Sequence, residues 1–384
     1  MQLSKINPFV SWWMTPYLPY QDIYELPLLK NKSFYAKVLH IFSNWLVHPI
    51  KRRLAKKYLE YLKRKSRIKV IGITGSAGKS TTTKILDSIL KLDGETVSTP
   101  PGIDPVFNIP NTILKCSTKT KYLILEMSVE FPGEMDYYLW IAKPNMAVIT
   151  NIMASHLEFF KDLEGVMHEK GKLVKSLNKT DVAFFNDSDI NLQKFSKKID
   201  CKVEWFKSDV DPMVQNFNTA TKVAKYLKIN SSIIEKGISD FKTPEHRLEL
   251  IHGRDGLTIL DDSYNSNPSA AVAAIKYFVK ISKGKPKIAV LGDMLQMGEY
   301  EETGHRLVGK EASKYNFEVI IGVGKSAKYI LEEVGKNSKN TKTLLVSNVD
   351  LAYKALRKYA KPGFFVLVKG SRSIGLDKLV REMV

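Results

Sequence analysis

Residues 70–81 read VIGITGSAGKST, an apolar run that passes into a glycine-rich loop ending in a lysine and two hydroxyl residues. An amphipathic segment, KILDSIL, follows at residues 84–90. A strand, a glycine loop and a helix in this order form a phosphate cradle, because glycines let backbone N–H groups close around an anion at the positive end of a helix. The residues of this cradle are Gly75, Ser76, Ala77, Gly78, Lys79, Ser80 and Thr81.

The loop carries the side chains that a nucleotide site needs. Lys79 is placed to reach the β- and γ-phosphates, and the Ser80 hydroxyl is placed to face Mg²⁺. The loop departs from its common form at one position, since Ile73 stands where the first glycine is expected. A glycine-rich turn that binds nothing would explain neither the lysine nor the hydroxyl residues. The sequence therefore predicts an ATP or GTP site.

The composition is ordinary for a soluble globular protein of two or three domains, with 384 residues, 44% of them hydrophobic and 26% charged. The two cysteines, Cys116 and Cys201, lack metal-ligand spacing and indicate a reducing compartment without disulfides. The net charge of +19 favours an anionic partner. Because no basic and aromatic signature of nucleic-acid binding stands out, we expect no nucleic acid among the partners.

Strands and helices alternate from residue 68 onward, which predicts parallel α/β architecture. Residues 242–245 contain a proline and are interpreted as a hinge between two such domains, and the polar stretch 187–230 has no clear pattern. The expected strands are 69–74, 122–126, 146–151 and 182–186 in the first domain, and 257–262, 287–291, 319–323, 343–346 and 364–368 in the second. The expected helices begin near Lys79 and Gly165 and span 270–281 and 304–315.

These patterns predict three parts. Residues 67–243 form a central ATPase domain, a P-loop built on a parallel sheet, and residues 244–384 form a Rossmann-like C-terminal α/β domain. Residues 1–66 form a short helical segment, rich in aromatic residues, with the basic tract KRRLAKK at 51–57. Aromatic residues beside a basic helix suit a lipid interface, but a helical pair packed on the next domain explains them equally well.

No cleavable signal peptide and no apolar segment of membrane-spanning length is visible. We therefore expect a cytoplasmic chain, which could contact the inner membrane face peripherally through residues 1–66.

Polar residues at the strand ends add to the predicted site. Glu126 ends a strand beside the phosphate loop, where a carboxylate is well placed to hold Mg²⁺. His156 follows another strand end, in the loop expected above the same sheet. Arg247, Asp262 and Asn265 could reach a nucleotide if the second domain closes on the first. Considered alone, Lys170 is one lysine of many and reads as a surface charge.

Nine segments together resemble the Mur ligase family, ATP-dependent enzymes that join an amino acid or a dipeptide to a carboxylate. The resemblance runs from about residue 68 to the C-terminus, and the order and spacing of the segments are specific. The segments are GITGSAGKSTT, NIPNTIL, EMSVEFPGEM, NIMASHLEFF, EKGKL, HRLE, DDSYNSNP, VLGDMLQMGE and LVKGSRS.

The resemblance implies roles for particular residues. Lys79 would bind the γ-phosphate, while Ser80 and Glu126 would hold one Mg²⁺ and His156 would serve a second. Lys170 matches a position where many members carry a carbamylated lysine, which replaces the surface interpretation. The resemblance also places Asn265 and Asn267 in the adenine-side loop, Arg247 and Asp262 at ATP, and Asn108 and Asn111 near the central substrate loop.

The resemblance implies a reaction in which a substrate carboxylate is activated as an acyl phosphate and then joined to an amine. Within the family the motifs favour addition of the dipeptide D-alanyl-D-alanine to a nucleotide-linked peptide precursor, a UDP-MurNAc-peptide of peptidoglycan, by a monomer using ATP and Mg²⁺. The usual domain that grips the UDP end is not recognisable in residues 1–66. Two alternatives therefore stay open: a different cell-wall or polyglutamate-like acceptor, and a catalytically silent membrane-associated scaffold.

Overall fold

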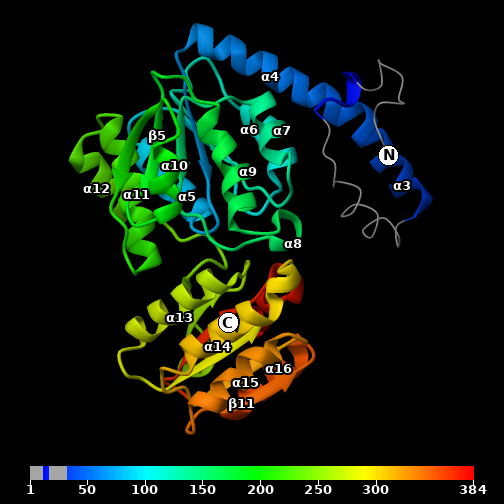
Figure 1. The fold of residues 1–384 in the computed structure, drawn as a ribbon, viewed down its shortest axis with the longest axis vertical. Helices are drawn as coiled ribbons and strands as arrows, with labels where there is room; N and C mark the ends of the chain where they lie inside the picture. Colours follow the sequence, from blue (N-terminus) through cyan, green and yellow to red (C-terminus); the bar gives the residue numbers. More distant parts are fainter. Residues whose placement is uncertain (1–11, 17–32) are drawn as a thin grey trace.

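The computed structural model describes residues 12–16 and 33–384, and Tyr17, Tyr20 and Tyr24 of the aromatic segment lie outside this part. Figure 1 shows an N-terminal helical arm, a central domain and a C-terminal domain in sequence order. The arm consists of α3 (Phe34–Phe42), the π-helical turn η2 (Ser43–Val47) and α4 (His48–Lys65).

The central domain is a six-stranded parallel sheet in the order β2-β3-β1-β4-β5-β6, with helices on both faces. Its strands are β1 (Lys69–Thr74), β2 (Thr96–Ser98), β3 (Tyr122–Glu126), β4 (Met146–Ile149), β5 (Val182–Asn186) and β6 (Lys202–Phe206). Its helices are α5 (Lys79–Leu90), α6 (Pro105–Ile113), α7 (Glu134–Ile141), α8 (Leu157–Phe160), α9 (Leu163–Lys175), α10 (Ile190–Ser196), α11 (Pro212–Tyr226) and α12 (Ser231–Ser239).

The register of the central sheet gathers the polar strand ends at one edge. Ile73 of β1 pairs with Glu126 of β3, and Thr74 pairs with Ile149 of β4, so the phosphate loop, Glu126 and the segment after β4 emerge side by side. Two apolar clusters, one on each face of the sheet, bury the strands on both sides. This double burial explains why the strands are almost wholly apolar in sequence.

The C-terminal domain has a second six-stranded sheet in the order β11-β10-β9-β12-β8-β7, parallel except that β7 runs antiparallel to β8. Its strands are β7 (Glu249–His252), β8 (Thr258–Asp262), β9 (Lys287–Gly292), β10 (Val319–Val323), β11 (Lys342–Val346) and β12 (Phe365–Lys369). Its helices are α13 (Pro268–Ser282), α14 (Glu301–Ala312), α15 (Ala327–Asn337), α16 (Val349–Tyr359) and α17 (Leu376–Met383), with 3₁₀ turns η3 (Arg254–Gly256), η4 (Gly298–Tyr300) and η5 (Arg372–Ile374).

The α/β architecture of both domains is confirmed, and the elements differ from the expected ones in several details. The strand expected at 146–151 ends at Ile149, and β2 and β7 were not among the expected strands. The polar stretch 187–230 folds into α10, β6, α11 and the loops around them, and the carboxylates of Asp189 and Asp211 cap the two helices.

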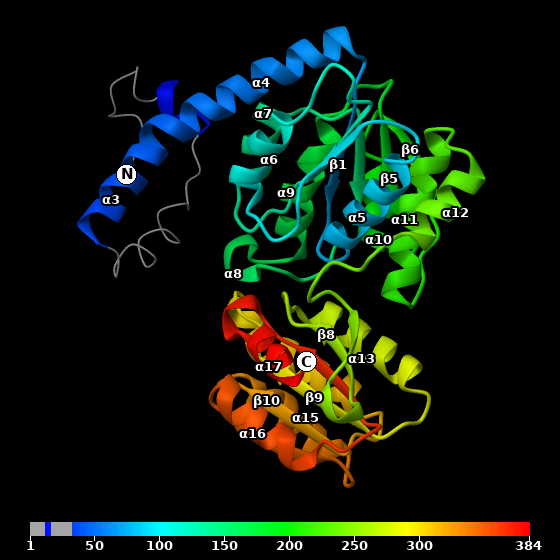
Figure 2. The ribbon, with the colours of Figure 1, turned by 180° about the vertical axis from the view of Figure 1, so that it is seen from behind.

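The N-terminal arm is packed at one end and exposed at the other. Ala55, Leu59 and Leu62 of α4 belong to the apolar cluster that α6 and α7 share, as the packing interpretation predicts. Helix α3 has no buried residue and lies clear of both domains in the two opposite views (Figures 1 and 2). Among the described residues no helix combines the length and the apolar character that crossing a membrane requires.

Candidate active site

The loop between β1 and α5 contains two glycines with positive φ, a backbone conformation that other residues rarely adopt. Gly75 has φ 143° and Gly78 has φ 82° at the start of α5. A Cβ added at Gly75 would lie 1.9 Å from Thr150 Oγ1, so no other residue fits there without displacing Thr150, the residue after β4. The tight turn places the loop at the N-terminus of α5, where backbone N–H groups can bind a phosphate group.

The segment after β4 holds this loop in place. The Asn151 side chain bonds both backbone groups of Ala77, accepting from its N–H at 2.9 Å and donating to its carbonyl at 3.2 Å. Ser76 Oγ donates to the Met153 carbonyl at 2.9 Å. Lys79 Nζ donates to the Gly75 carbonyl at 2.9 Å, and burial lowers its pKa while Glu126 acts in the opposite direction. The cradle is thus preorganised around a half-buried lysine that lines the cavity.

Oxygen ligands converge beside the cradle. Ser80 Oγ donates to Glu126 Oε2 at 2.7 Å, and Ser128 Oγ donates to Glu126 Oε1 at 3.0 Å. A hydroxyl and a carboxylate from α5 and the end of β3 are the hard donors that Mg²⁺ prefers, and Mg²⁺ keeps several waters or phosphate oxygens besides. These residues fit that ion.

His156 caps the short helix α8 with a left-handed backbone, φ 54°. Its Nδ1 lies 2.6 Å from Gln296 Oε1 of the C-terminal domain. Burial lowers the pKa of His156 to about 3, and the charges of Lys170 and Lys79 act in the same direction. The imidazole is therefore neutral at physiological pH, the form in which histidine can bind a metal.

Lys170 lies in the interior of α9 with 1% of its surface exposed, so the surface-charge interpretation is wrong. Burial lowers its pKa to about 7 and the charge of Lys79 adds to this effect, whereas Glu134, Glu169 and Glu130 oppose it. A large neutral fraction of the amine at physiological pH follows from this environment.

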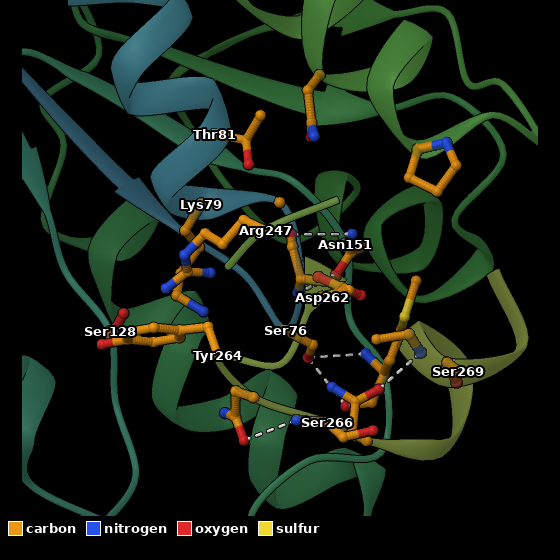
Figure 3. A pocket seen from close by; sticks show the side chains of 18 of the residues that line it. Ser76, Lys79, Thr81, Ser128, Asn151, Arg247, Asp262, Tyr264, Ser266 and Ser269 are labelled. Carbon is orange, nitrogen blue, oxygen red and sulfur yellow. Dashed lines mark hydrogen bonds between the residues drawn. The ribbon is translucent and has the colours of Figure 1, made fainter. Parts of the chain in front are cut away.

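The C-terminal domain presents a charged wall to the cradle. Lys369 Nζ donates to Asp262 Oδ2 at 2.5 Å and to the Asn265 carbonyl at 2.9 Å. The Arg247 guanidinium lies 4.0 Å from the centre of the Tyr264 ring (Figure 3). Partial burial raises the pKa of Asp262, and the neighbouring Lys369 and Arg247 oppose that shift.

A cavity of about 560 Å³ between the two domains brings most of the predicted site residues together. Gly75, Ser80 and Lys170 lie outside its lining: Ser80 and Lys170 are buried, and Gly75 is the first residue of the loop. Asn108 lines the cavity and Asn111 does not. The predicted residues in the lining are Ser76, Ala77, Gly78, Lys79, Thr81, Glu126, His156, Arg247, Asp262, Asn265 and Asn267.

Comparison with known families decides what this arrangement belongs to. The Mur ligase middle domain matches residues 73–244, and the Mur ligase glutamate ligase domain matches residues 246–372. The chain belongs to the Mur ligase family. As a Mur ligase it is an ATP-dependent enzyme that forms amide bonds, with ATP and Mg²⁺ as its cofactors.

Individual relatives agree across most of the chain. The UDP-N-acetylmuramoyl-tripeptide–D-alanyl-D-alanine ligase of Buchnera aphidicola (subsp. Baizongia pistaciae) is 29% identical over 366 residues, covering 85% of this chain and 78% of that protein. The Bacillus subtilis ligase of the same name is 28% identical over 363 residues, covering 87% and 79%. The MurF ligase of Thermotoga maritima in complex with ADP has a TM-score of 0.76 at 23% identity, covering 87% and 82%.

Several cavity residues of this Mur ligase had no predicted role, among them two glutamates, a tyrosine and a lysine. Glu130 and Glu134 line the cavity, and burial raises the pKa of both, that of Glu134 to about 8. The Tyr138 hydroxyl is buried without a hydrogen-bond partner in the described part of the chain. Lys369 holds Asp262. A signal for the two glutamates was present in EFPGE, which sets them four residues apart after β3.

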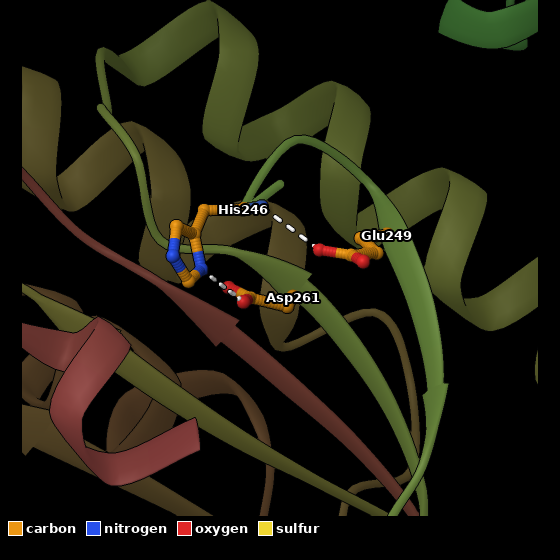
Figure 4. A group of neighbouring side chains, drawn as sticks. All are labelled: His246, Glu249 and Asp261. Carbon is orange, nitrogen blue, oxygen red and sulfur yellow. Dashed lines mark hydrogen bonds and ion pairs between the residues drawn. The ribbon is translucent and has the colours of Figure 1, made fainter. Parts of the chain in front are cut away.

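Close to the cavity, the hinge of this Mur ligase is fixed by a histidine and two carboxylates (Figure 4). His246 Nδ1 lies 2.6 Å from Asp261 Oδ2, and the His246 N–H donates to Glu249 Oε2 at 3.0 Å. His246 and Leu248 both have positive φ, 61° and 53°, on either side of Arg247. The His246 ring is paired with Asp261 and its backbone N–H with Glu249, so we interpret these groups as supports for Arg247 rather than as a metal site.

Proposed function

We propose that this Mur ligase joins D-alanyl-D-alanine to the peptide carboxylate of a UDP-MurNAc-tripeptide, a step in building the cell wall. The observation that carries the proposal is the cavity, which has a phosphate cradle on one wall and charged residues of the C-terminal domain, Arg247 and Asp262 among them, on the other. The names of the two relatives compared above support this choice of substrates. One chain supplies both walls, which supports a monomeric enzyme.

In the proposed reaction the substrate carboxylate attacks the γ-phosphorus of ATP, and ADP leaves with the bond's electrons. The resulting acyl phosphate is attacked by the amine of the dipeptide, and inorganic phosphate leaves from the tetrahedral intermediate as the amine loses a proton. Lys79 neutralises charge on the transferred phosphoryl group, and the loop amides orient it. Bound Mg²⁺ supplies further charge neutralisation on the phosphate oxygens.

We assign the two magnesium sites on the donor groups described above. Ser80 and Glu126 hold one ion, and His156 serves the second through its remaining ring nitrogen. Lys170 assists the second site as a carbamate: its neutral amine attacks the carbon of CO₂, loses a proton to water and becomes a carboxylate. The lowered pKa of Lys170, about 7, supports this because only the neutral amine reacts.

The adenine side is assigned to the loop before α13. Asn267 accepts from the Ala270 N–H at 2.9 Å and Asn265 accepts from the Ser266 N–H at 2.8 Å, so both side-chain oxygens are engaged. Their amide nitrogens are the groups left to donate to a base. Arg247 and Asp262 complete the nucleotide site from the hinge side, and Asn108 and Asn111 stay assigned to the region of the peptide substrate.

The test of the proposed reaction is phosphate release from ATP with a UDP-MurNAc-tripeptide and D-alanyl-D-alanine. We expect release to require both substrates and to be lost in Lys79→Ala. Lys84→Ala, which removes an exposed lysine from the same helix, is the matched control and retains activity. Phosphate release that ignores every amine would contradict a ligase, and full biological function of Lys79→Ala would favour the silent scaffold.

A screen of acceptors separates the two ligase alternatives. Activity with a different wall precursor or a polyglutamate-like acceptor, and none with the UDP-MurNAc-tripeptide, would keep the chemistry and change the substrate.

We also propose that the N-terminal arm binds the anionic inner face of the cell membrane. Large apolar side chains of α3 are exposed, Phe34 by 75% and Leu39 by 67%, and a soluble helix rarely leaves such a face uncovered. Lys57, Arg64 and Lys65 are exposed along α4, which complements anionic lipid. Arg52, by contrast, is buried and donates to the Trp13 carbonyl at 3.1 Å, so it is removed from the basic tract available to lipid.

A further inference from the structure

The loop between β9 and α14 of the C-terminal domain rests on α8 of the central domain. The backbone carbonyl of Gln296 accepts from the Glu158 N–H at 3.3 Å. A Cβ added at Gly298 would lie 3.2 Å from Glu158 Cα, so the two backbones are in close contact. Tyr300 packs against the apolar clusters of both domains. Residues 296–300 therefore form a contact between the two domains, and we call this contact the seat.

The Gln296 side chain extends from that seat into the candidate site. Its Oε1 lies 2.6 Å from His156 Nδ1, and its amide also hydrogen-bonds the Glu130 carboxylate. An amide oxygen only accepts, so Nδ1 carries the proton and the lone pair of the histidine is on Nε2. One side chain of the C-terminal domain thus sets the tautomer and ring direction of a histidine in the central domain.

The backbone at both ends of this contact is in a region that residues with a Cβ rarely adopt. Gln296 has φ 60° and His156 has φ 54°. Such conformations persist where the surroundings hold them, and they gather at sites where positioning matters. The residues at both ends of the contact therefore have a backbone conformation that the surrounding structure must hold in place.

We propose that Gln296 is a positioning residue that couples the seating of the C-terminal domain to the orientation of the His156 ring. The Nε2 ligand atom is presented correctly only when the loop rests on α8, so the second cation site is complete only in the closed enzyme. This inference rests on the proposed role of His156 at that site. It assigns the partner of His156 to the opposite domain, which makes closure a condition for cation binding.

The test measures cation binding and closure in the full chain rather than activity alone. The probe is Mn²⁺, titrated calorimetrically with a non-hydrolysable ATP analogue present, and small-angle X-ray scattering follows closure. For Gln296→Ala we expect apparent Mn²⁺ affinity to fall about 10- to 100-fold, as for other residues that orient a metal-binding histidine. We also expect kcat to fall while the KM for ATP changes little, and the closed scattering profile to be lost. Leu295→Ala, an exposed neighbour, is the control and keeps both properties.

A charge exchange separates positioning from a general loss of packing. In Gln296→Glu the new carboxylate faces Glu130, and we expect affinity to fall because like charges repel. Adding Glu130→Gln restores a donor and acceptor pair between the two positions, and we expect most of the affinity to return. A double variant no better than Gln296→Glu would overturn the proposal, even if Gln296→Ala fails to fold.

Two further outcomes distinguish this inference from the function it rests on. A folded Gln296→Ala with wild-type Mn²⁺ affinity and scattering would overturn the coupling and leave the ligase intact. If His156→Ala itself leaves Mn²⁺ affinity unchanged, the assigned role of His156 is wrong, and the coupling to a cation site is wrong with it.

Discussion

Lys170 shows how burial changes the protonation of a single lysine. At its buried position the amine has a pKa of about 7, because burial and the charge of Lys79 outweigh three nearby glutamates. The neutral fraction therefore rises as pH rises through 7, and carbamate formation, which consumes the neutral amine, is expected to rise with it.

We expect Lys170→Ala to lower kcat by about 100-fold, because the carbamate oxygens and their support of the cation are lost. Acetate or formate should restore part of the rate by supplying the missing carboxylate. The control is Lys175→Ala, an exposed lysine on the same helix, which should behave as wild type. The carbamate itself is measured by ¹³C NMR with labelled bicarbonate. Full activity in Lys170→Ala would contradict the role.

The sequence reveals a candidate site residue when the residues that act with it are close to it along the chain. Lys79 and Ser80 follow from one contiguous loop, and Glu126 from its place at a strand end. Lys170 needed the family resemblance, since burial of a lysine inside α9 leaves no mark in its own segment. Gln296 was missed because its partner His156 is 140 residues away in the other domain.

At the scale of elements, the start of α7 carries an unusual carboxyl group. Glu134 Oε2 accepts from the Phe131 N–H at 2.9 Å and also from the N–H of Glu130. Burial nevertheless raises the pKa of Glu134 from 4.5 to about 8, and the two backbone bonds oppose the shift without cancelling it. The folded state thus holds a proton that the unfolded state releases between these two values.

Because the native state binds more protons in that window, the free energy of unfolding should fall as pH rises from about 5 to 8, by up to about 1.4 kcal/mol per pH unit from this group. Glu134→Gln keeps an oxygen acceptor for both N–H groups and removes the titration, so its urea midpoint should fall less over this range. Glu164→Gln, an exposed glutamate on α9, is the control and should follow wild type. Equal slopes for wild type and Glu134→Gln would rule out this titration.

Most of the strands that the sequence predicted are buried on both faces, whereas the edge strand β11 was predicted from its short apolar run although it is half exposed. The strands β1, β3, β9 and β10 are continuous apolar runs, which a short window of sequence already reveals. Strand β7 was missed because it alternates between half-buried and exposed residues, and β2 was missed because it has only three residues. Helices α10 and α11 were missed because polar residues, including the capping aspartates Asp189 and Asp211, dominate their segment.

At the scale of the whole molecule, the N-terminal arm and the cavity lie in different parts of the structure. The cavity lies between the central and C-terminal domains, whereas α3 lies out beyond the central domain on the end of α4 (Figure 2). An arm bound to a surface would therefore leave the cleft between the domains accessible to substrates. The cluster shared by α4, α6 and α7 ties the arm to the central domain.

Vesicle sedimentation of the full chain tests the arm. We expect binding to vesicles that contain anionic lipid, none to neutral vesicles, and a loss of binding as salt rises, because the attraction is screened within about 10 Å at 0.1 M salt. Exposed basic residues contribute roughly 1 kcal/mol each near such a surface. The charge reversal Lys57→Glu, Arg64→Glu and Lys65→Glu should therefore abolish sedimentation at low salt.

The matched control places the same charge change elsewhere. Lys336→Glu, Lys339→Glu and Lys361→Glu reverse three exposed lysines of the C-terminal domain and lower the net charge equally, so any difference between the triple variants reports the arm itself. Phe34→Ser with Leu39→Ser should weaken binding without removing its salt dependence, because the apolar face inserts while the basic face attracts. Two results would contradict the membrane role of the arm: no binding of the full chain to anionic vesicles at low salt, or an equal loss of binding in both triple variants. The exposed apolar face of α3 would then need another explanation, such as a protein partner.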